Sequence, residues 1–432
     1  MSLTVTEIRQ NLFTVFSSLL DRREEFLQNP KSDFTRKKKI SFEQTMLFPM
    51  IAGADNVATE LLDLFGEENL PLPSAMIQRR NQVKKEAFKE MFHLFNEKIP
   101  KEKSFHGYQI AACDGSRLNL PYNPSDSNTL VDNIEGRKGF NQLHMNALYD
   151  VMNDVFLDVE IQGMHEMNER DALCKFLDKN AGSAQKTIYV ADRGYASFNI
   201  YAHAINNGQL FLIRMKEGDA RCLCTDNKHM FDDPLVDEDV TVHIGRKRKK
   251  RNSAYENYHF IRKGHRYDFI DYRTDKVDSL KLRVLKFPLS TDTFECIVTN
   301  LPKELFSLTA IKELYHLRWS EETAFRHLKY AGNMVHIHSI KEDFLIQEIY
   351  GKLTMYNFAA CISKAVNERK KPSTTHTYRF NHAQLQKFVR LFIIGTVKKL
   401  EILVNRFMAP VRPGRKFKRN VRRQSAEPLF YR

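Results

Sequence analysis

The chain has 432 residues, of which 42% are hydrophobic and 28% are charged, a composition typical of a folded, soluble protein. No apolar run approaches the ~18–20 residues of a membrane helix, and the polar start, MSLTVTEIRQ, lacks a signal-peptide core. Six irregularly spaced cysteines favour a reduced cytoplasmic setting over a disulfide scaffold. Walker A and dinucleotide-binding motifs are missing from the sequence, which argues against a nucleotide-driven machine.

The charge of the chain is strongly positive and unevenly distributed. The formal net charge is +14, and residues 401–432 carry nine cations against two acids, about half of the excess. A concentrated positive charge favours a polyanionic partner, because neutralised phosphates release their counterions. Net charge alone also fits a generally basic soluble protein.

Residues 1–100 are predicted to form an all-helical domain. Apolar residues recur at spacings of three and four in segments 42–53, 56–67 and 74–97, and Ser74 is the expected N-cap of the third segment. That third segment is polar and basic, with Arg79, Arg80, Lys84 and Lys85. Two interpretations stay open: a helix-turn-helix-like DNA-binding domain, or a helical bundle with a solvated basic face.

The rest of the chain is predicted to be an α/β fold with a mixed sheet. In residues 101–217, three sequential strands are followed by alternating helix and strand, and residues 218–300 consist of short alternating segments that indicate a β-rich insertion. Helical patterning returns in residues 301–370. Residues 371–432 are predicted to hold a last helical region, about 381–408, and a basic tail.

Two aspartates follow predicted buried strands. Asp114 comes after IAAC and Asp192 after TIYVA, so each carboxylate is expected at the carboxyl end of a strand, where open α/β sheets place their sites. Aspartate is also common in turns and at strand ends that cap a loop, so each residue taken singly favours a structural role over a catalytic one.

A third acid belongs to a polar stripe on a predicted helix. Tyr315, Arg318, Glu322 and Lys329 follow at spacings of three, four and seven, and their directions fall within an arc of about 60° on one helix face. A solvated face with an Arg318–Glu322 ion pair would show the same spacing. A separate apolar stripe lets this helix bury one side and still present the polar group.

The pattern Y-x2-R-x3-E-x6-K, together with the two aspartates, resembles the YREK signature of the IS-four family of insertion-sequence transposases, over about residues 40–365. The resemblance implies a DDE recombinase with an RNase H-like catalytic core. In this family a β-rich insertion interrupts the core between the second and third acids, which are 130 residues apart here.

The resemblance also implies a chemistry. Asp114, Asp192 and Glu322 would be the catalytic acids and the ligands of two Mg²⁺ (or Mn²⁺) ions, which activate water and stabilise the leaving oxygen. Arg318, Lys329 and Arg193 would hold phosphates near the active site, and Tyr315 would pack against a sugar–phosphate unit. The implied partners are double-stranded DNA, both terminal inverted repeats and target, and a second copy in a homodimer.

The insertion offers further candidates for DNA contact. Its basic run, expected at a hairpin tip, consists of Arg246, Lys247, Arg248, Lys249, Lys250 and Arg251, and a solvated loop is the alternative. Family members that cut through a DNA hairpin hold a base with a tryptophan of the insertion. The only tryptophan here, Trp319, lies in the signature helix, so Phe294 is the expected substitute.

These observations favour a DNA transposase that cleaves the ends of a mobile element and joins them to target DNA. One alternative is a stand-alone metal-dependent nuclease on the same core. The other is a non-catalytic DNA-binding relative, which would not need an intact set of three acids.

Overall fold

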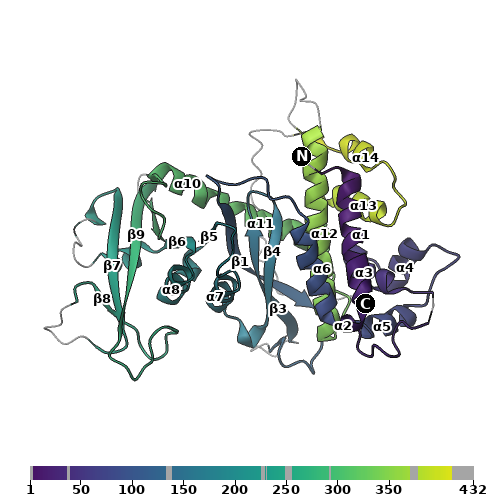
Figure 1. Cartoon of the computed structure of the whole chain (residues 1–432), viewed down its shortest axis with the longest axis horizontal. Coiled ribbons are helices and arrows are strands. Elements are labelled where there is room, and N and C mark those ends of the chain that lie inside the picture. Colours follow the sequence, from purple (N-terminus) through teal and green to yellow (C-terminus); the bar gives the residue numbers. More distant parts are fainter. Residues whose placement is uncertain are drawn as a thin grey trace.

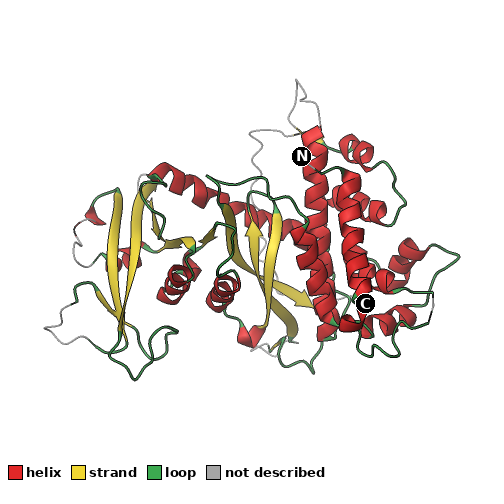
Figure 2. Ribbon diagram, in the orientation of Figure 1, coloured by secondary structure: helices red, strands yellow, loops and turns green. Residues whose placement is uncertain are grey.

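The structure is a computed structural model (Figures 1 and 2). It describes residues 3–36, 39–132, 139–224, 229, 231–248, 255–290, 293–369 and 378–410. The predicted basic tail beyond 410 therefore lies outside the described residues. Helices stand at one end of the molecule in Figure 2, and the last strands of a long sheet stand at the other.

Helices fill the chain before the first strand, as predicted. They are α1 (Val5–Asp21), α2 (Arg23–Phe26), α3 (Phe42–Ile51), α4 (Val57–Phe65), α5 (Pro73–Asn81) and α6 (Lys85–Glu97). The predicted helix 74–97 is wrong in one respect, because it is divided between α5 and α6. Val83 pairs with Leu27 and the Lys84 N–H bonds the Phe26 carbonyl, which takes this backbone out of the helix. Ser74 is not the N-cap, since α5 already begins at Pro73.

The strands that follow form the central part of a mixed sheet. They are β1 (Gln109–Leu120), β2 (Leu130–Val131), β3 (Phe140–Asp150), β4 (Val155–Gly163), β5 (Thr187–Ala191) and β6 (Leu210–Met215). The order across the sheet is β4-β3-β1-β5-β6, and the short β2 also pairs with β3. β3 is antiparallel to β1 and β4, whereas β1, β5 and β6 run parallel. The crossovers contain η1 (Met164–Glu166), α7 (Glu169–Lys179), η2 (Arg193–Tyr195) and α8 (Phe198–Asn206), as the alternating pattern predicted.

The segment predicted as a β-rich insertion extends this same sheet. Its elements are α9 (Glu217–Leu223), β7 (Val236–Gly245), β8 (Tyr258–Phe260), β9 (Val277–Ser290) and β10 (Thr293–Thr299). β10 pairs with β6, and the order continues β10-β9-β7-β8 to the far edge in Figure 1. Two parts of the segment predicted to be β-rich, residues 218–300, are not strands: residues 218–223 belong to α9, and residues 267–273 (YDFIDYR) are irregular.

Helices after the sheet return to the N-terminal ones. They are α10 (Leu308–Leu317), α11 (Trp319–Arg326), the π-helical turn η4 (His327–Ala331), α12 (Glu342–Arg369), α13 (His382–Ile393) and α14 (Leu400–Arg406), and the short strands β11 (Tyr378–Arg379) and β12 (Ala409–Pro410) pair with each other. α12 packs along α1, α3 and α6 (Figure 1), so the first and last parts of the chain form one helical layer. No helix in the described ranges is both long and apolar enough to cross a membrane.

The sheet separates two hydrophobic cores. Ile110 and Ala112 of β1 belong to the core shared with α6, α11 and α12, whereas Ala111 and Cys113 belong to the core shared with α7 and α8. Alternate residues of a strand point to opposite faces. This alternation directs Asp114 to the side on which α11 lies against β1.

A buried polar joint connects α5 to α12. The Arg80 guanidinium pairs with Glu348 at 3.2 Å and donates to Gln347 and to the Phe344 carbonyl, and the Arg80 and Glu348 side chains are 5% and 2% exposed. Arg79 is also buried, with its guanidinium 4.4 Å above the Phe34 ring. Arg80 is covered by α12 and Arg79 packs against Phe34, so this structure exposes neither of the side chains predicted to contact DNA.

Lys352, one turn beyond Glu348, should make stability depend on pH. Its ammonium donates to the Ala52 carbonyl at 3.0 Å, and burial lowers the pKa of Lys352 to about 8. An unfolded lysine titrates near 10.4, so between these values the unfolded chain binds the extra proton. The free energy of unfolding from this group should then rise with pH, by at most about 1.4 kcal/mol per unit.

Urea unfolding of the wild type and Lys352→Met between pH 7 and 9.5 checks this expectation. The stability of the wild type relative to the variant should increase above pH 8, and the comparison cancels the ionisation of other groups. A constant difference across this range would contradict the assignment.

Candidate active site

The two predicted aspartates lie side by side on adjacent parallel strands. The β1–β5 pairing ends with Cys113 opposite Ala191, and Asp114 and Asp192 are the next residues of the two strands. Asp114 is not at the end of its strand as predicted, because β1 continues to Leu120 through its pairing with β3. Each carboxylate accepts a nearby backbone N–H, from Gly115 at 2.8 Å and from Gly194 at 2.7 Å, which fixes its orientation.

The pKa of Asp114 depends on its burial and on nearby charges of both signs. Burial raises its pKa to about 6, against the hydrogen bond from Gly115 and the charge of Arg318, while Asp192 and Glu169 raise the pKa further. The pKa of Lys329 is lowered by its own burial, and Asp114 opposes that shift. Arg318 and Lys329, both from the predicted stripe, therefore act electrostatically on the same carboxylate.

The stripe itself is less regular than the predicted helix. Arg318 joins α10 to α11 in helical backbone conformation, and the helix ends in a π-turn, in which the Gly332 N–H bonds the His327 carbonyl. Lys329 lies in this wider turn, so the regular spacing assumed for it does not hold. Tyr315 is buried, and the Arg318 guanidinium carbon lies 5.7 Å from its ring centre. In this structure Tyr315 packs on Arg318, which is also buried, so the contact of Tyr315 with DNA stays a prediction.

Two neighbouring glutamates of α11 point in different directions. Glu322, the predicted third acid, is 48% exposed and lies 3.4 Å from Arg318. Glu321 is completely buried, and neither of its carboxylate oxygens makes a hydrogen bond of good geometry. Burial and the nearby charge of Asp114 raise the pKa of Glu321 well above its usual range. A buried carboxyl group thus lies near enough to Asp114 for their charges to interact. Sequence reasoning missed it, since helical spacing alone did not distinguish the two positions.

Glu169 is a further acid that the sequence analysis did not identify. It opens α7 and lies 3.2 Å from His144, an interaction that lowers the pKa of Glu169. A side chain at Gly115 would lie 2.5 Å from a Glu169 oxygen, and one at Gly194 would lie 3.9 Å from the other. Glu169 therefore occupies the space that two glycines leave beside the aspartates. Its position at a helix start was the one available signal.

These carboxylates do not form a ready metal centre. Among the residues that the structure describes, no three His, Cys, Asp or Glu side chains are grouped so that they could hold a metal ion. The oxygen donors are of the type that Mg²⁺ prefers, but the arrangement does not fit an ion, because Glu322 lies beside Arg318. An ion shared by the three acids requires Glu322 to leave that arrangement.

The other predicted DNA contacts are scattered. Arg193 is exposed in η2, immediately after Asp192. Lys84 donates to the Glu25 carbonyl, and Lys85 pairs with Glu342 at 2.8 Å, so both help to pack the helical layer. Phe294 is half-buried, and the Lys286 ammonium lies 4.4 Å from its ring centre. One face of this expected base-stacking residue is therefore occupied.

Several residues of the basic run in the insertion are engaged in contacts within the protein. Arg246 is buried and donates to four backbone carbonyls of residues 262–270, so it is a structural residue and not a DNA contact. Lys247 pairs with Asp275, and the Arg248 guanidinium lies 5.9 Å from the Phe260 ring centre. Lys249, Lys250 and Arg251 lie outside the described residues.

A family model for the transposase DDE domain matches residues 105–358, more than half of the chain. The chain belongs to this transposase DDE domain family. The DDE domain thus extends from just before β1 into α12, includes both aspartates and the signature helix, and leaves α1–α6 outside.

The other comparisons add little. No curated protein matches the chain. One similar solved structure is a cryo-EM structure of the piggyBac transposase synaptic complex with hairpin DNA, with a TM-score of 0.40, 8% identity, and coverage of 86% of this chain and 76% of that one. A likeness at this level carries no functional argument.

Proposed function

We propose that this DDE domain protein is a DNA transposase that cleaves the ends of its mobile element and joins them to target DNA. The observation that carries the proposal is the juxtaposition of Asp114 and Asp192 on adjacent strands, with the positive charges of Arg318 and Lys329 near enough to interact with Asp114. The strand order β4-β3-β1-β5-β6, antiparallel and then parallel, supports an RNase H-like core.

The residues around Asp114 suit phosphodiester chemistry. Arg318 is 5% exposed and lies beside Glu322, so in our proposal its guanidinium offers two parallel donors to a phosphate once Glu322 moves away. Lys329 then adds a point charge. The Tyr315 ring packs against the Arg318 guanidinium, so we infer that Tyr315 positions this arginine rather than touching DNA. DDE transposases use divalent ions. As arranged in this structure the three acids do not fit an ion. If Glu322 leaves Arg318, Asp114, Asp192 and Glu322 would be the residues to hold Mg²⁺ or Mn²⁺, and such ions would supply an activated water and stabilise the leaving oxygen.

The partners follow from the reaction. The substrates would be double-stranded terminal inverted repeats and target DNA, and two ends cut in one complex suggest a homodimer on DNA. A stand-alone nuclease is the second candidate, because the acids and cations alone serve cleavage equally well. Family membership favours transposition, since the matched model is that of a transposase domain.

The decisive experiment uses DNA cloned from both flanks of the coding sequence. Purified protein with Mg²⁺ should nick or cut at the element ends and join the released 3′ ends to a supercoiled plasmid, with a target duplication at each insertion. Cleavage without joining would favour the nuclease. Binding without cleavage would favour the non-catalytic relative.

Lys329→Ala should lower the rate of end cleavage by more than its loss of DNA affinity explains. Loss of one phosphate contact should reduce the salt dependence of binding by about one ion. A phosphate misplaced by ~1 Å can cost about 100-fold in rate. Arg318→Lys should also be slow, because an ammonium does not reproduce the two-pronged contact.

Cleavage rates and affinities over a salt series measure both effects, with the exposed Lys281→Ala of β9 as the matched control. If both Lys329→Ala and Arg318→Lys cleave at the wild-type rate, neither side chain positions a phosphate, and the polar stripe has no role in cleavage.

A further inference from the structure

Glu321 of α11 is an acid that the proposed chemistry does not use. Its side chain is 0% exposed, and within the described ranges neither of its carboxylate oxygens has a hydrogen-bond partner. A buried carboxyl group without a partner destabilises a fold. A residue that costs stability beside a proposed active site is a candidate for a role in the reaction.

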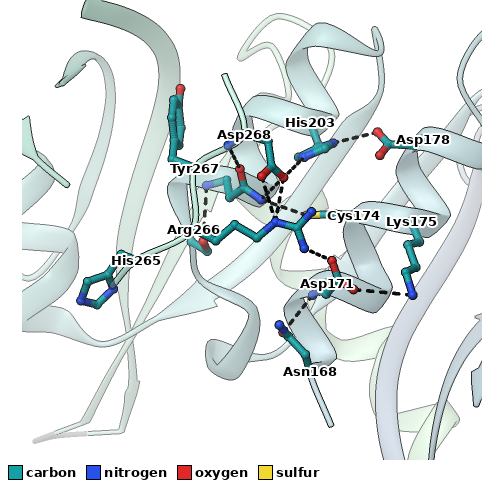
Figure 3. Close-up of polar contacts among 12 residues, drawn as sticks. Asn168, Asp171, Cys174, Lys175, Asp178, His203, His265, Arg266, Tyr267 and Asp268 are labelled. Carbon is teal, nitrogen blue, oxygen red and sulfur yellow. Dashed lines mark hydrogen bonds and ion pairs between the residues drawn. The ribbon is translucent and has the colours of Figure 1, made fainter. Parts of the chain in front are cut away.

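A carboxylate elsewhere in the DDE domain shows the contrast. Asp268 pairs with Arg266 at 2.9 Å and lies 3.1 Å from a ring nitrogen of His203 (Figure 3). Asn199 of α8 donates to the same carboxylate at 3.0 Å. The hydrogen-bonding capacity of Asp268 is thus used within the fold, whereas the oxygens of Glu321 are left to accept a donor.

A buried donor without a partner lies one turn before Glu321. The Glu321 N–H bonds the Arg318 carbonyl at 3.0 Å, and side chains three residues apart on a helix are neighbours. The Arg318 side chain is 5% exposed, and its Nε has no hydrogen-bond partner in the part of the chain that the structure describes. Burial and the charge of Asp114 raise the pKa of Glu321, and the charge of Arg318 opposes them. The free donor and the free acceptor are therefore close enough for their charges to interact.

The present partner of Arg318 is less firmly held than the arginine itself. The Arg318 Nη2 lies 3.4 Å from a Glu322 oxygen, which is long for a charged hydrogen bond, and Glu322 is 48% exposed. Glu322 can therefore turn away while Arg318 stays buried. A buried guanidinium that loses its carboxylate is strongly destabilised unless another acceptor replaces it.

We propose that Glu321 is a positioning residue, which accepts a hydrogen bond from the Arg318 Nε when Glu322 leaves this arginine. A carboxyl oxygen accepts in the ionised and in the protonated form, so the role does not depend on the charge of Glu321. Held at Nε, the guanidinium keeps its two terminal nitrogens for a phosphate. The inference rests on the proposed function for the phosphate, but the exchange of partners is measurable without DNA.

Thermal unfolding of the full chain tests the exchange. Glu321→Met alone should leave the midpoint unchanged or raise it, because an apolar chain of similar size replaces an unpaired carboxyl. In the Glu322→Ala background, where Arg318 has lost its present partner, Glu321→Met should lower the midpoint by about 3 °C. Glu321→Gln, which keeps an acceptor oxygen, should not. As a matched control, Glu313→Ala at an exposed acid of α10 should not change the effect of Glu321→Met.

Binding of element-end DNA in EDTA, where cleavage is blocked, tests the position of the guanidinium. In the Glu322→Ala background, Glu321→Met should reduce the salt slope of binding by about 0.9, the value for one phosphate of a duplex. Glu321→Gln should keep the slope. With Arg318→Ala also present, Glu321→Met should have no further effect, because the contact that it positions is already lost.

Three results would overturn the proposal. They are a midpoint change for Glu321→Met that is the same with and without Glu322, an equal loss for Glu321→Gln and Glu321→Met, and an unchanged salt slope. A large loss of stability in Glu321→Met alone would also overturn it, because Glu321 would then already serve the fold. If the wild type binds no element-end DNA, the proposed function fails, but the unfolding midpoints still decide the exchange of partners.

Discussion

Asp114→Asn should reduce cleavage of element-end DNA by about a thousandfold or more and leave end binding within about twofold of wild type. Loss of this carboxylate removes the central acid of the site, worth several kcal/mol of transition-state stabilisation, and each 1.36 kcal/mol is tenfold in rate. The amide keeps the shape of the side chain. Affinity should hold, because the cations Arg318 and Lys329 stay in place.

Single-turnover cleavage and gel-shift assays measure the two quantities separately. Asp192→Asn should behave in the same way, since Asp192 occupies the matching position on β5. Asp63→Asn, an exposed acid of α4 outside the DDE domain, should cleave normally. If Asp114→Asn cuts at the wild-type rate, the two-strand site is not the active site.

Arg80→Ala should destabilise the whole protein by about 3–5 kcal/mol, because it leaves the Glu348 carboxylate buried and unpaired. The same change removes the hydrogen bonds to Gln347 and to the Phe344 carbonyl. Any loss of DNA binding should then follow unfolding, in contrast to a direct contact with DNA. Urea unfolding with a parallel gel shift measures both quantities.

Two further variants distinguish loss of stability at the buried Arg80–Glu348 pair from loss of a direct DNA contact. Lys85→Ala breaks only partly exposed ion pairs with Glu342 and Asp343, so it should change stability by less than about 1 kcal/mol. Arg80→Met combined with Glu348→Met should recover most of the loss, because neither charge is then buried alone. A stable Arg80→Ala protein with weakened end binding would restore the DNA-contact interpretation.

Most elements of the central sheet could be predicted from the sequence. β1, β3, β4, β5 and β6 and the helices between them follow local patterns, since alternation and helical spacing depend on neighbours within a few residues. The pattern also indicated Asp114 and Asp192 as acids that follow buried strand residues. The order of Tyr315, Arg318, Glu322 and Lys329 suggested a transposase. The match of residues 105–358 to the transposase DDE domain supports a DDE transposase.

Only the tertiary structure decided which of these groups are covered. Arg79 and Arg80 have the sequence pattern of a solvated basic pair, but α12, more than 250 residues later, buries Arg80, and Phe34 packs over Arg79. The strands of residues 218–300 suggested an insertion, and only the β10–β6 pairing shows that they lengthen the central sheet. Glu169 and Glu321 enter the site because packing brings α7 and α11 to β1. Long-range burial of this kind leaves no local periodicity, which is why the sequence determined the elements and the packing determined their roles.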